Sequence, residues 1–103
     1  MNIFQKLFSE TPKVDLKSIV EQGAFLVDVR TPGEFAEGHV KGSVNIPLDK
    51  VVSEMPKFKN KKNIIVFCRS GNRSAQAKSI LEQNGITGVV NGGTWQDVNQ
   101  FVQ

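Results

Sequence analysis

Apolar, β-favouring runs alternate along the chain with short segments of helical periodicity. The runs at 25–29 and 63–67 are apolar at nearly every position, which is typical of strands buried on both faces of a sheet. Shorter runs at 44–46 and 89–90 predict two more strands. Strands that alternate with helices predict an α/β fold: a mostly parallel sheet of four or five strands, right-handed crossovers and helices on both faces.

Helix start and stop signals divide the segments between these runs. A side-chain oxygen at the start of a helix and a glycine or proline at its end are strong signals of this kind. They predict a helix over 15–22, capped by Asp15 and ended by Gly23; a short helix opened by the capping box at 31–34 and ended before Gly38; a helix from Asp49 to Pro56; a helix ending at 84–85 with Ala77, Ile80 and Leu81 inward; and, after a chain turn at 92–93, a last helix capped by Thr94.

The only cysteine of the chain, Cys68, lies directly after the second strong run and just before a predicted helix. Ligand sites of parallel sheets lie beyond the carboxyl ends of the strands. The helix start, a tight turn at Gly71 and the nearby Arg69 and Arg73 all favour a thiolate over a thiol. We therefore predict a reactive Cys68 thiolate at the floor of a pocket for a small oxyanion. A buried structural cysteine is the alternative.

Four segments carry a family resemblance: 26–30 followed by Glu34-Phe35, 38–47, the loop 68–74, and Gly92-Gly93. In this order they resemble the motifs of the single-domain rhodanese family of sulfurtransferases. The resemblance implies a rhodanese-like α/β fold, a five-stranded mostly parallel sheet with helices on both faces, in a single domain over residues 1–103. It also implies an enzyme, a thiosulfate sulfurtransferase, that moves a sulfane sulfur from a donor such as thiosulfate to cyanide or a thiol.

Within this interpretation the catalytic residue is Cys68, which becomes a persulfide, and the loop after it binds substrate. Backbone N–H groups of the loop are expected to hold the anionic sulfur. Arg73 is expected to meet the sulfonate end of the donor and Arg69 the pocket mouth, with a surface cation as the alternative for each. Asn72 is the expected helix N-cap. No cofactor or metal is required. The predicted substrate-binding residues are Arg69, Ser70, Gly71, Asn72 and Arg73.

Several neighbouring residues are expected to have structural roles. Asp28 and Arg30 follow the first strong strand, and an ion pair that braces the site is favoured over direct contact with substrate. Ser74 is expected to stabilise the first turn of the helix, with a hydrogen bond to the thiolate as the alternative. His39 is expected to be a hydrogen-bonding structural residue, and Trp95 a core residue.

Composition and charge limit the classes of partner that the chain is expected to bind. With 103 residues and one cysteine, the chain is long enough for one hydrophobic core and has no internal disulfide. A net charge of +3 gives no argument for nucleic acid, and no stretch approaches the roughly 18 apolar residues of a membrane helix. Residues 1–8 lack a secretory cleavage site, so we expect a cytoplasmic protein. We also expect a monomer that binds small molecules, with a sulfur-relay protein as a further candidate partner. A lysine cluster predicts a solvated loop, with a docking patch as the alternative; it comprises Lys57, Lys59, Lys61 and Lys62.

Two other functions compete with this interpretation. Cysteine phosphatases and arsenate reductases share the loop chemistry but space cysteine and arginine as C-x5-R. Cys68 and Arg73 have the spacing C-x4-R, and Ser74 stands at the phosphatase position. The shorter loop makes a tighter cradle, which suits one sulfur and crowds a tetrahedral phosphate. The second alternative is a sulfur-carrier module that takes its sulfur from a partner protein and turns over little thiosulfate.

Overall fold

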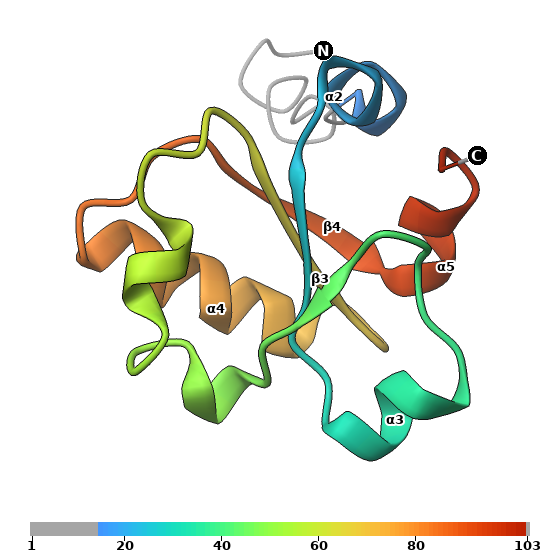
Figure 1. The fold of residues 1–103 in the computed structure, drawn as a ribbon, viewed down its shortest axis with the longest axis horizontal. Helices are drawn as coiled ribbons and strands as arrows, with labels where there is room; N and C mark the ends of the chain where they lie inside the picture. The colour runs from blue at the N-terminus through green and yellow to red at the C-terminus, as the bar shows by residue number, and fades with distance from the viewer. Residues whose placement is uncertain (1–14, 103) are drawn as a thin grey trace, which may run out of the picture.

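The structure, a computed structural model, describes residues 15–102. Its sheet has four parallel strands in the order β2-β1-β3-β4 (Figure 1). They are β1 (Phe25–Asp28), β2 (Val44–Asn45), β3 (Ile64–Cys68) and β4 (Val89–Thr94). Each strand overlaps one of the apolar runs of the sequence, so the predicted parallel α/β sheet is confirmed.

The number of strands differs from the number that the family resemblance implied. Over residues 15–102 the sheet has four strands and not five. Most of the other apolar positions in this range recur at helical spacing or lie between Pro47 and Pro56, so they form helices and tight turns rather than another extended strand. Residues 1–8, in which no secretory signal was predicted, lie outside the described residues.

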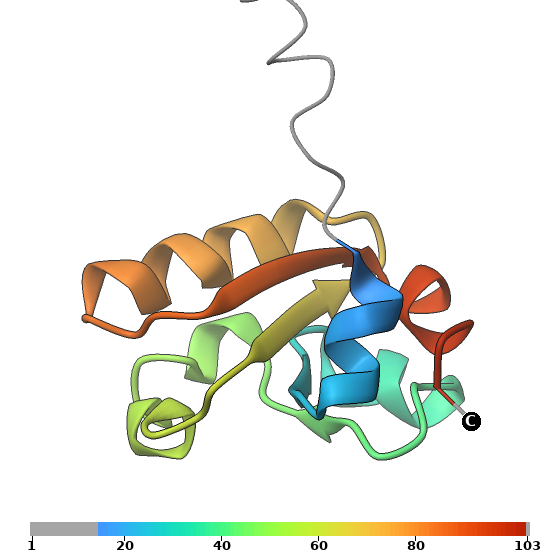
Figure 2. The same ribbon diagram turned by 90° about the horizontal axis from the view of Figure 1, so that it is seen from above.

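Helices cover both faces of the sheet, as predicted (Figure 2). On one face lies the long helix α4 (Asn72–Gln83), together with the short 3-10 helices η1 (Leu48–Lys50) and η2 (Met55–Phe58). On the other face lie α2 (Leu16–Gln22) and α5 (Trp95–Asn99). The sheet is therefore the middle layer of three.

The central strand β3 is buried along its whole length. Successive side chains of a strand point to opposite faces, and here they enter two separate cores. Ile64, Val66 and Cys68 pack in the core under α4. Ile65 and Phe67 pack in the core shared with α2 and α5. Burial on both sides fixes the end of β3, and with it the backbone of Cys68.

Helix ends follow the predicted signals. At the start of α2, the Asp15 carboxylate accepts a hydrogen bond from the Ser18 N–H at 3.1 Å. The helix α3 (Pro32–Glu37) opens with a reciprocal capping box. Its Thr31 hydroxyl oxygen accepts from the Glu34 N–H at 3.2 Å, and the Glu34 carboxylate accepts from the Thr31 N–H at 3.0 Å. The box also fixes the position of the Glu34 carboxylate.

The segment 48–58 departs from the prediction. The sequence predicted one helix from Asp49 to Pro56, whereas the structure has η1 and η2 joined by turns. Pro56 lies in the first turn of η2 instead of closing a helix. A proline has no N–H for the preceding turn and disfavours helical backbone in the residue before it. Val51 is buried while Val52 is 63% exposed, so only one of the two valines joins the core.

The end of β4 departs from the prediction as well. The sequence predicted a chain turn at Gly92 and Gly93, yet both residues belong to the strand. Val66 pairs with Asn91, and the next residue, Phe67, pairs with Gly93, so Gly92 is the extra residue of a β-bulge. The bulge carries Asn91 and Gly93 to the carboxyl end of β3.

Close packing explains why the bulged residue is glycine. A Cβ atom at Gly92 would lie 2.7 Å from Val98 Cγ2 and 2.8 Å from Ile65 Cγ2. Such distances leave no room for a side chain, so α5 and β3 would have to separate. Glycine therefore lets β4 lie directly against both elements.

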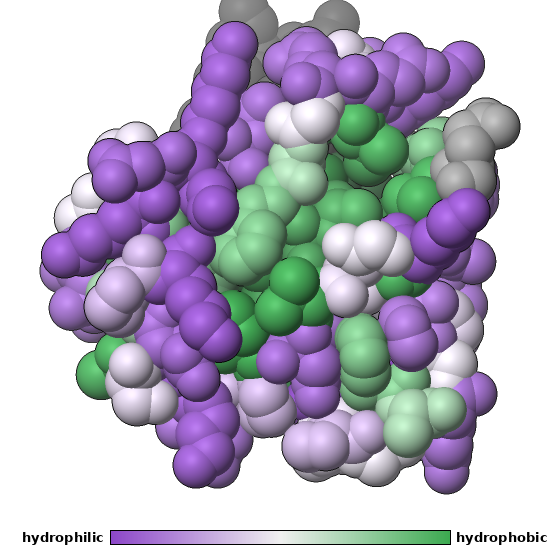
Figure 3. All heavy atoms as spheres, viewed as in Figure 1, coloured by the Kyte–Doolittle hydropathy of each residue, from purple (hydrophilic) through white to green (hydrophobic). Residues whose placement is uncertain are grey.

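Few large apolar side chains are exposed in the described part of the chain. Val44 is 38% exposed and Val52 is 63% exposed. On the face shown in Figure 3, apolar side chains gather near the centre, and hydrophilic ones surround them. Over residues 15–102, no helix combines the length and the apolar character needed to cross a membrane.

Candidate active site

Cys68 is the last residue of β3, and a tight turn leads from it into α4. The side chain of Cys68 has no exposed surface, and its Sγ accepts a hydrogen bond from the Gly71 N–H at 3.0 Å. Gly71 has a φ of 97°, which glycine adopts without steric cost. Gly71 thus provides the turn that the sequence predicted. Gly71, and not Asn72, occupies the N-cap position of α4, because Asn72 already has helical backbone.

A hydrogen-bonded group of side chains lies behind the sulfur. Ser74 is buried, and its Oγ lies 3.5 Å from Cys68 Sγ. The Ser74 hydroxyl also donates to Asn91 Oδ1 at 2.7 Å. Asn91 in turn accepts from the Gly93 N–H at 2.9 Å, and its Nδ2 donates to the Gly71 carbonyl at 3.2 Å. The end of β4 therefore supports both the loop turn and the hydroxyl beside the sulfur.

Asn91 is the site residue that sequence reasoning missed. It follows the run at 89–90 and precedes two glycines, so its position at the end of a predicted strand was visible in the sequence. Carboxyl ends of parallel strands meet at one edge of the sheet, and this rule would have placed Asn91 near Cys68. The predicted turn at residues 92–93 concealed it.

The pKa of the Cys68 thiol is lowered from its ordinary value. Burial has the largest single influence and raises the pKa, but hydrogen bonds outweigh it. The Ser74 hydroxyl contributes most, followed by backbone groups of Ser74, Gly71 and Ser70. The direction agrees with the sequence prediction. The sequence also predicted that the two guanidinium groups lower this pKa, whereas the main lowering causes are these hydrogen bonds.

Alkylation of Cys68 by iodoacetamide should reach its plateau rate near neutral pH. Hydrogen bonds to Sγ stabilise the thiolate, so the midpoint of the pH profile should fall below the value of about 8.5 that is usual for a free thiol. Rates are measured by mass spectrometry over a series of pH values, with a cysteine peptide as the control. A midpoint at or above that of the peptide would make Cys68 an ordinary buried thiol.

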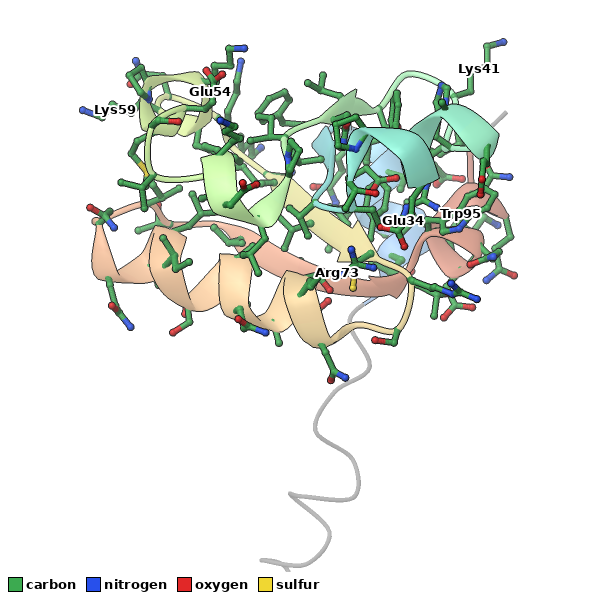
Figure 4. All side chains as sticks on the ribbon, turned by 90° about the horizontal axis from the view of Figure 1, so that it is seen from below. Glu34, Lys41, Glu54, Lys59, Arg73 and Trp95 are labelled. Carbon is green, nitrogen blue, oxygen red and sulfur yellow. The ribbon has the colours of Figure 1, made fainter. Side chains whose placement is uncertain are left out.

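Arg73 forms a bidentate ion pair with Glu34. Nη1 of Arg73 lies 2.7 Å from Glu34 Oε1, and Nη2 lies 3.0 Å from Oε2. Figure 4 shows Arg73 of α4 reaching toward Glu34 of α3. The hydrogen bond from Arg73 is the main reason why the pKa of Glu34 falls from 4.5 to about 2, and the Thr31 N–H adds to it. The pair ties the start of α4 to the start of α3.

Acid should weaken the fold through this pair. The folded-state pKa of Glu34, about 2, lies below the ordinary 4.5, so the pair stabilises the folded state above pH 4.5 and this stability is lost as the pH falls toward 2. Glu34→Gln should show a smaller loss of unfolding free energy across this window. Urea denaturation at several pH values measures both proteins. Equal pH dependence would mean that the pair does not contribute.

Asp28 and Arg30 form the ion pair that the sequence predicted. Nη2 of Arg30 lies 2.7 Å from Asp28 Oδ2, and the two side chains are 5% and 0% exposed. The guanidinium of Arg30 also donates to the Gly38 carbonyl at 2.7 Å and lies 4.9 Å from the centre of the Trp95 ring. The pair joins the end of β1 to the segment after α3 and to α5.

His39 and Trp95 have the structural roles that were predicted. Nδ1 of His39 lies 2.8 Å from the Phe35 carbonyl oxygen, and its ring stacks on the Phe35 ring at 3.8 Å. Trp95 packs against the core of Val98 and Phe67. Its contact with Arg30 makes Trp95 a wall of the site as well.

A pocket of about 280 Å³ adjoins the loop 68–74. Arg69 is exposed and lines this pocket. Arg30 and Arg73 are paired with carboxylates, whereas Arg69 forms no ion pair within residues 15–102. Arg69 is therefore the arginine at the pocket that is available to an external anion. The lining consists of Arg30, Glu34, Glu37, Gly38, Arg69, Trp95 and Gln96.

The predicted substrate-binding loop divides into two parts. Gly71 contacts the sulfur through its N–H, while the side chains of Ser70 and Asn72 are exposed. Arg69 lines the pocket, and Arg73 turns to Glu34. In the described part of the chain, no three His, Cys, Asp or Glu side chains gather in a group that could hold a metal ion.

Similar proteins share this architecture. The profile of the rhodanese-like domain family matches residues 13–96. Thiosulfate sulfurtransferase PspE of Escherichia coli is 39% identical over 70% of this chain and 71% of its own length. Thiosulfate sulfurtransferase GlpE of Pseudomonas syringae pv. syringae is 33% identical over 84% of this chain and 83% of its own. A solved structure of a rhodanese with anions from E. coli matches with a TM-score of 0.66 and 38% identity, over 73% of this chain and 91% of that chain.

The family match covers the sheet and the loop 68–74, from α2 to the start of α5. It agrees with the position of Cys68 at the carboxyl end of the buried parallel strand β3. The chain belongs to the rhodanese-like family and is an enzyme of the sulfurtransferase class.

Proposed function

We propose that this enzyme transfers the outer sulfur of thiosulfate to cyanide or a thiol through a persulfide on Cys68. In the first step the Cys68 thiolate attacks the outer sulfur of thiosulfate. The S–S bond of thiosulfate breaks, and sulfite leaves with the electron pair. In the second step cyanide attacks the terminal sulfur of the persulfide, thiocyanate leaves, and the thiolate is restored. A thiolate acceptor would leave as a persulfide in the same way.

One observation carries this proposal: the Gly71 N–H points at Cys68 Sγ from 3.0 Å. A donor fixed at the sulfur stabilises the thiolate before the reaction without reorganising during it. Together with the Ser74 hydroxyl, which contributes most, this N–H lowers the pKa of the thiol. Two names of relatives, PspE and GlpE, point to thiosulfate as donor.

The alternative of phosphate chemistry gains no support. A cysteine phosphatase needs an arginine that is directed at the bound oxyanion from the start of the helix. The arginine at the start of α4, Arg73, is held by both oxygens of Glu34. At the position of the phosphatase arginine stands Ser74, which is buried and bonded to Asn91.

The test is the intact mass of the protein after incubation with thiosulfate and gel filtration. The mass should rise by one sulfur atom and return to its original value when cyanide is added. Thiocyanate should appear in equal amount. An unchanged mass with thiosulfate and with other sulfane donors would contradict the proposal. If the mass rises but the bound sulfur is released only in the presence of a partner protein, the result would favour the sulfur carrier.

Arg69→Ala should raise the apparent KM for thiosulfate by about tenfold to a hundredfold, which is the usual effect of losing one charge-assisted contact. Arg69 has no carboxylate partner among the described residues and lines the pocket, so we propose that Arg69, rather than Arg73, meets the sulfonate end of the donor. Attack by cyanide on the preformed persulfide should change little, because the sulfonate has left by then. Both half-reactions are followed by stopped-flow kinetics.

The matched control is Arg73→Ala. Arg73 is occupied by Glu34, so its loss should loosen the start of α4 and slow both half-reactions to a similar degree. If Arg73→Ala raised KM alone and Arg69→Ala did not, the donor would be held by Arg73 and the assignment would be wrong.

A further inference from the structure

The Ser74 hydroxyl lies between two acceptors but carries one proton. Its Oγ is 2.7 Å from Asn91 Oδ1 and 3.5 Å from Cys68 Sγ. A hydroxyl group donates one hydrogen bond and accepts up to two. Only one of the two neighbours can receive the Ser74 proton at any time.

The orientation of the Asn91 amide decides which neighbour receives it while Cys68 is a thiol. The Gly93 N–H can only donate, and it faces Oδ1; the Gly71 carbonyl can only accept, and it faces Nδ2. Both backbone contacts therefore require the same amide orientation. Oδ1 has no proton, so Ser74 must be the donor in the 2.7 Å contact. The thiol of Cys68 then donates to Ser74 Oγ.

Loss of the thiol proton changes which group receives the Ser74 hydrogen bond. A thiolate can only accept, and charged acceptors form the stronger hydrogen bonds. We propose that Asn91 is a positioning residue that competes with the Cys68 sulfur for the Ser74 proton, so that the hydroxyl turns from Asn91 to Sγ when the thiolate forms. Asn91 keeps its hydrogen bonds to Gly93 and Gly71. The Ser74 hydroxyl can therefore turn away from Asn91 without movement of the backbone.

The same switch would operate in the catalytic cycle. When Sγ shares its electron pair in the new S–S bond of the persulfide, Sγ becomes neutral and the charge moves to the terminal sulfur. The Ser74 hydroxyl then turns back and donates its hydrogen bond to Asn91 Oδ1 again. This step rests on the proposed function, whereas the switch between thiol and thiolate does not.

Changing Ser74 and Asn91 alters none of the charged side chains on the elements that surround the loop. They come from the catalytic loop and α4, from α3, from the end of β1 and from α5. They are Arg69, Arg73, Glu34, Asp28, Arg30 and Asp97. A shift in the titration of Cys68 that depends on both Ser74 and Asn91 therefore reports the hydroxyl proton.

The test is a double-mutant cycle on the pH midpoint of the Cys68 thiolate. Asn91→Ala should free the Ser74 proton for the sulfur and lower the midpoint by about half a unit to one unit, a threefold to tenfold change in the equilibrium. Asn91→Leu, which keeps the branched side-chain skeleton but has no acceptor, should do the same. Ser74→Ala should raise the midpoint, and adding Asn91→Ala to it should then have no effect. The ultraviolet absorbance of the thiolate gives the midpoint without a reagent.

Three results would overturn the inference. If the Asn91 variants raised the midpoint with and without Ser74, Asn91 would only hold the loop. If they lowered it equally in both backgrounds, Asn91 would act without Ser74. No change in either background would mean that the two acceptors do not compete. None of these results depends on sulfur transfer, so a failed mass test leaves this experiment interpretable.

A second measurement uses the wild-type protein and covers the case in which an Asn91 variant does not fold. The side-chain carbonyl carbon of Asn91 loses a hydrogen bond when Ser74 turns away. Its NMR shift should therefore change with the same midpoint as the thiolate absorbance, and this change should vanish in Ser74→Ala. A carbonyl shift that does not follow the thiolate would contradict the switch.

Discussion

Cys68→Ser should fold like the wild-type protein and transfer no sulfur. Serine is close to cysteine in size, and its Oγ can still accept the hydrogen bond that the Gly71 N–H donates at 3.0 Å to Sγ. A hydroxyl stays protonated at neutral pH and cannot carry a stable sulfane sulfur. Turnover of thiosulfate with cyanide should fall to the background rate, and the mass gain with thiosulfate should disappear.

Cys68→Ala separates the chemical role of this residue from its structural one. It removes the acceptor for the Gly71 N–H as well as the nucleophile, and an N–H left without a partner costs about 1–3 kcal/mol. The alanine variant should therefore unfold at a lower temperature than the serine variant, although neither has activity. Measurable transfer by either variant would mean that the nucleophile is another group.

Asp28→Ala should destabilise the protein by about 3–5 kcal/mol, because it leaves the Arg30 charge buried without its partner. Both side chains are almost fully buried, at 0% and 5% exposure. Domains of this kind have a free energy of unfolding of about 5–15 kcal/mol, so roughly a fifth or more of the stability would be lost. The melting temperature should fall by on the order of 15–30 °C, as measured by circular dichroism.

An exposed ion pair in the same protein gives the matched control. Lys78 and Glu82 of α4 lie 3.9 Å apart, and their side chains are 39% and 54% exposed. Solvent screens such pairs, so Glu82→Ala should cost less than about 1 kcal/mol. If Asp28→Ala cost as little as Glu82→Ala, the buried pair would not brace the site.

Features set by neighbouring residues were predictable from the sequence. The continuous apolar runs identify β1 and β3, because every side chain of a strand buried on both faces must be apolar or paired. The capping box of Thr31 and Glu34 spans four residues, and its partners contact each other in the structure as expected. Asp28 and Arg30 are two residues apart at the end of one strand, so their pairing could also be predicted.

Features set by distant residues were not predictable. Glu34 and Arg73 are 39 residues apart in the chain, and their spacing gives no sign that they meet. The pairing of Arg73 with Glu34 was therefore not among the predicted contacts. Gly92 and Gly93 indicate a turn when they are considered alone, and only the pairing of β4 with β3 converts the first of them into a bulge. The position of Asn91 at a strand end was visible in the sequence, but its contacts with Ser74 and Gly71 depend on the same pairing.

Because the Cys68 side chain has no exposed surface, we expect the loop around it to open before any reagent reaches the sulfur. Any reagent must wait for the open state, whose population is set by a local equilibrium. At low reagent concentration the rate is the product of that equilibrium and the chemical rate. At high concentration it saturates at the opening rate, which is the same for all small reagents. Saturation curves for two such reagents would thus separate how often the sulfur is reached from how fast it reacts.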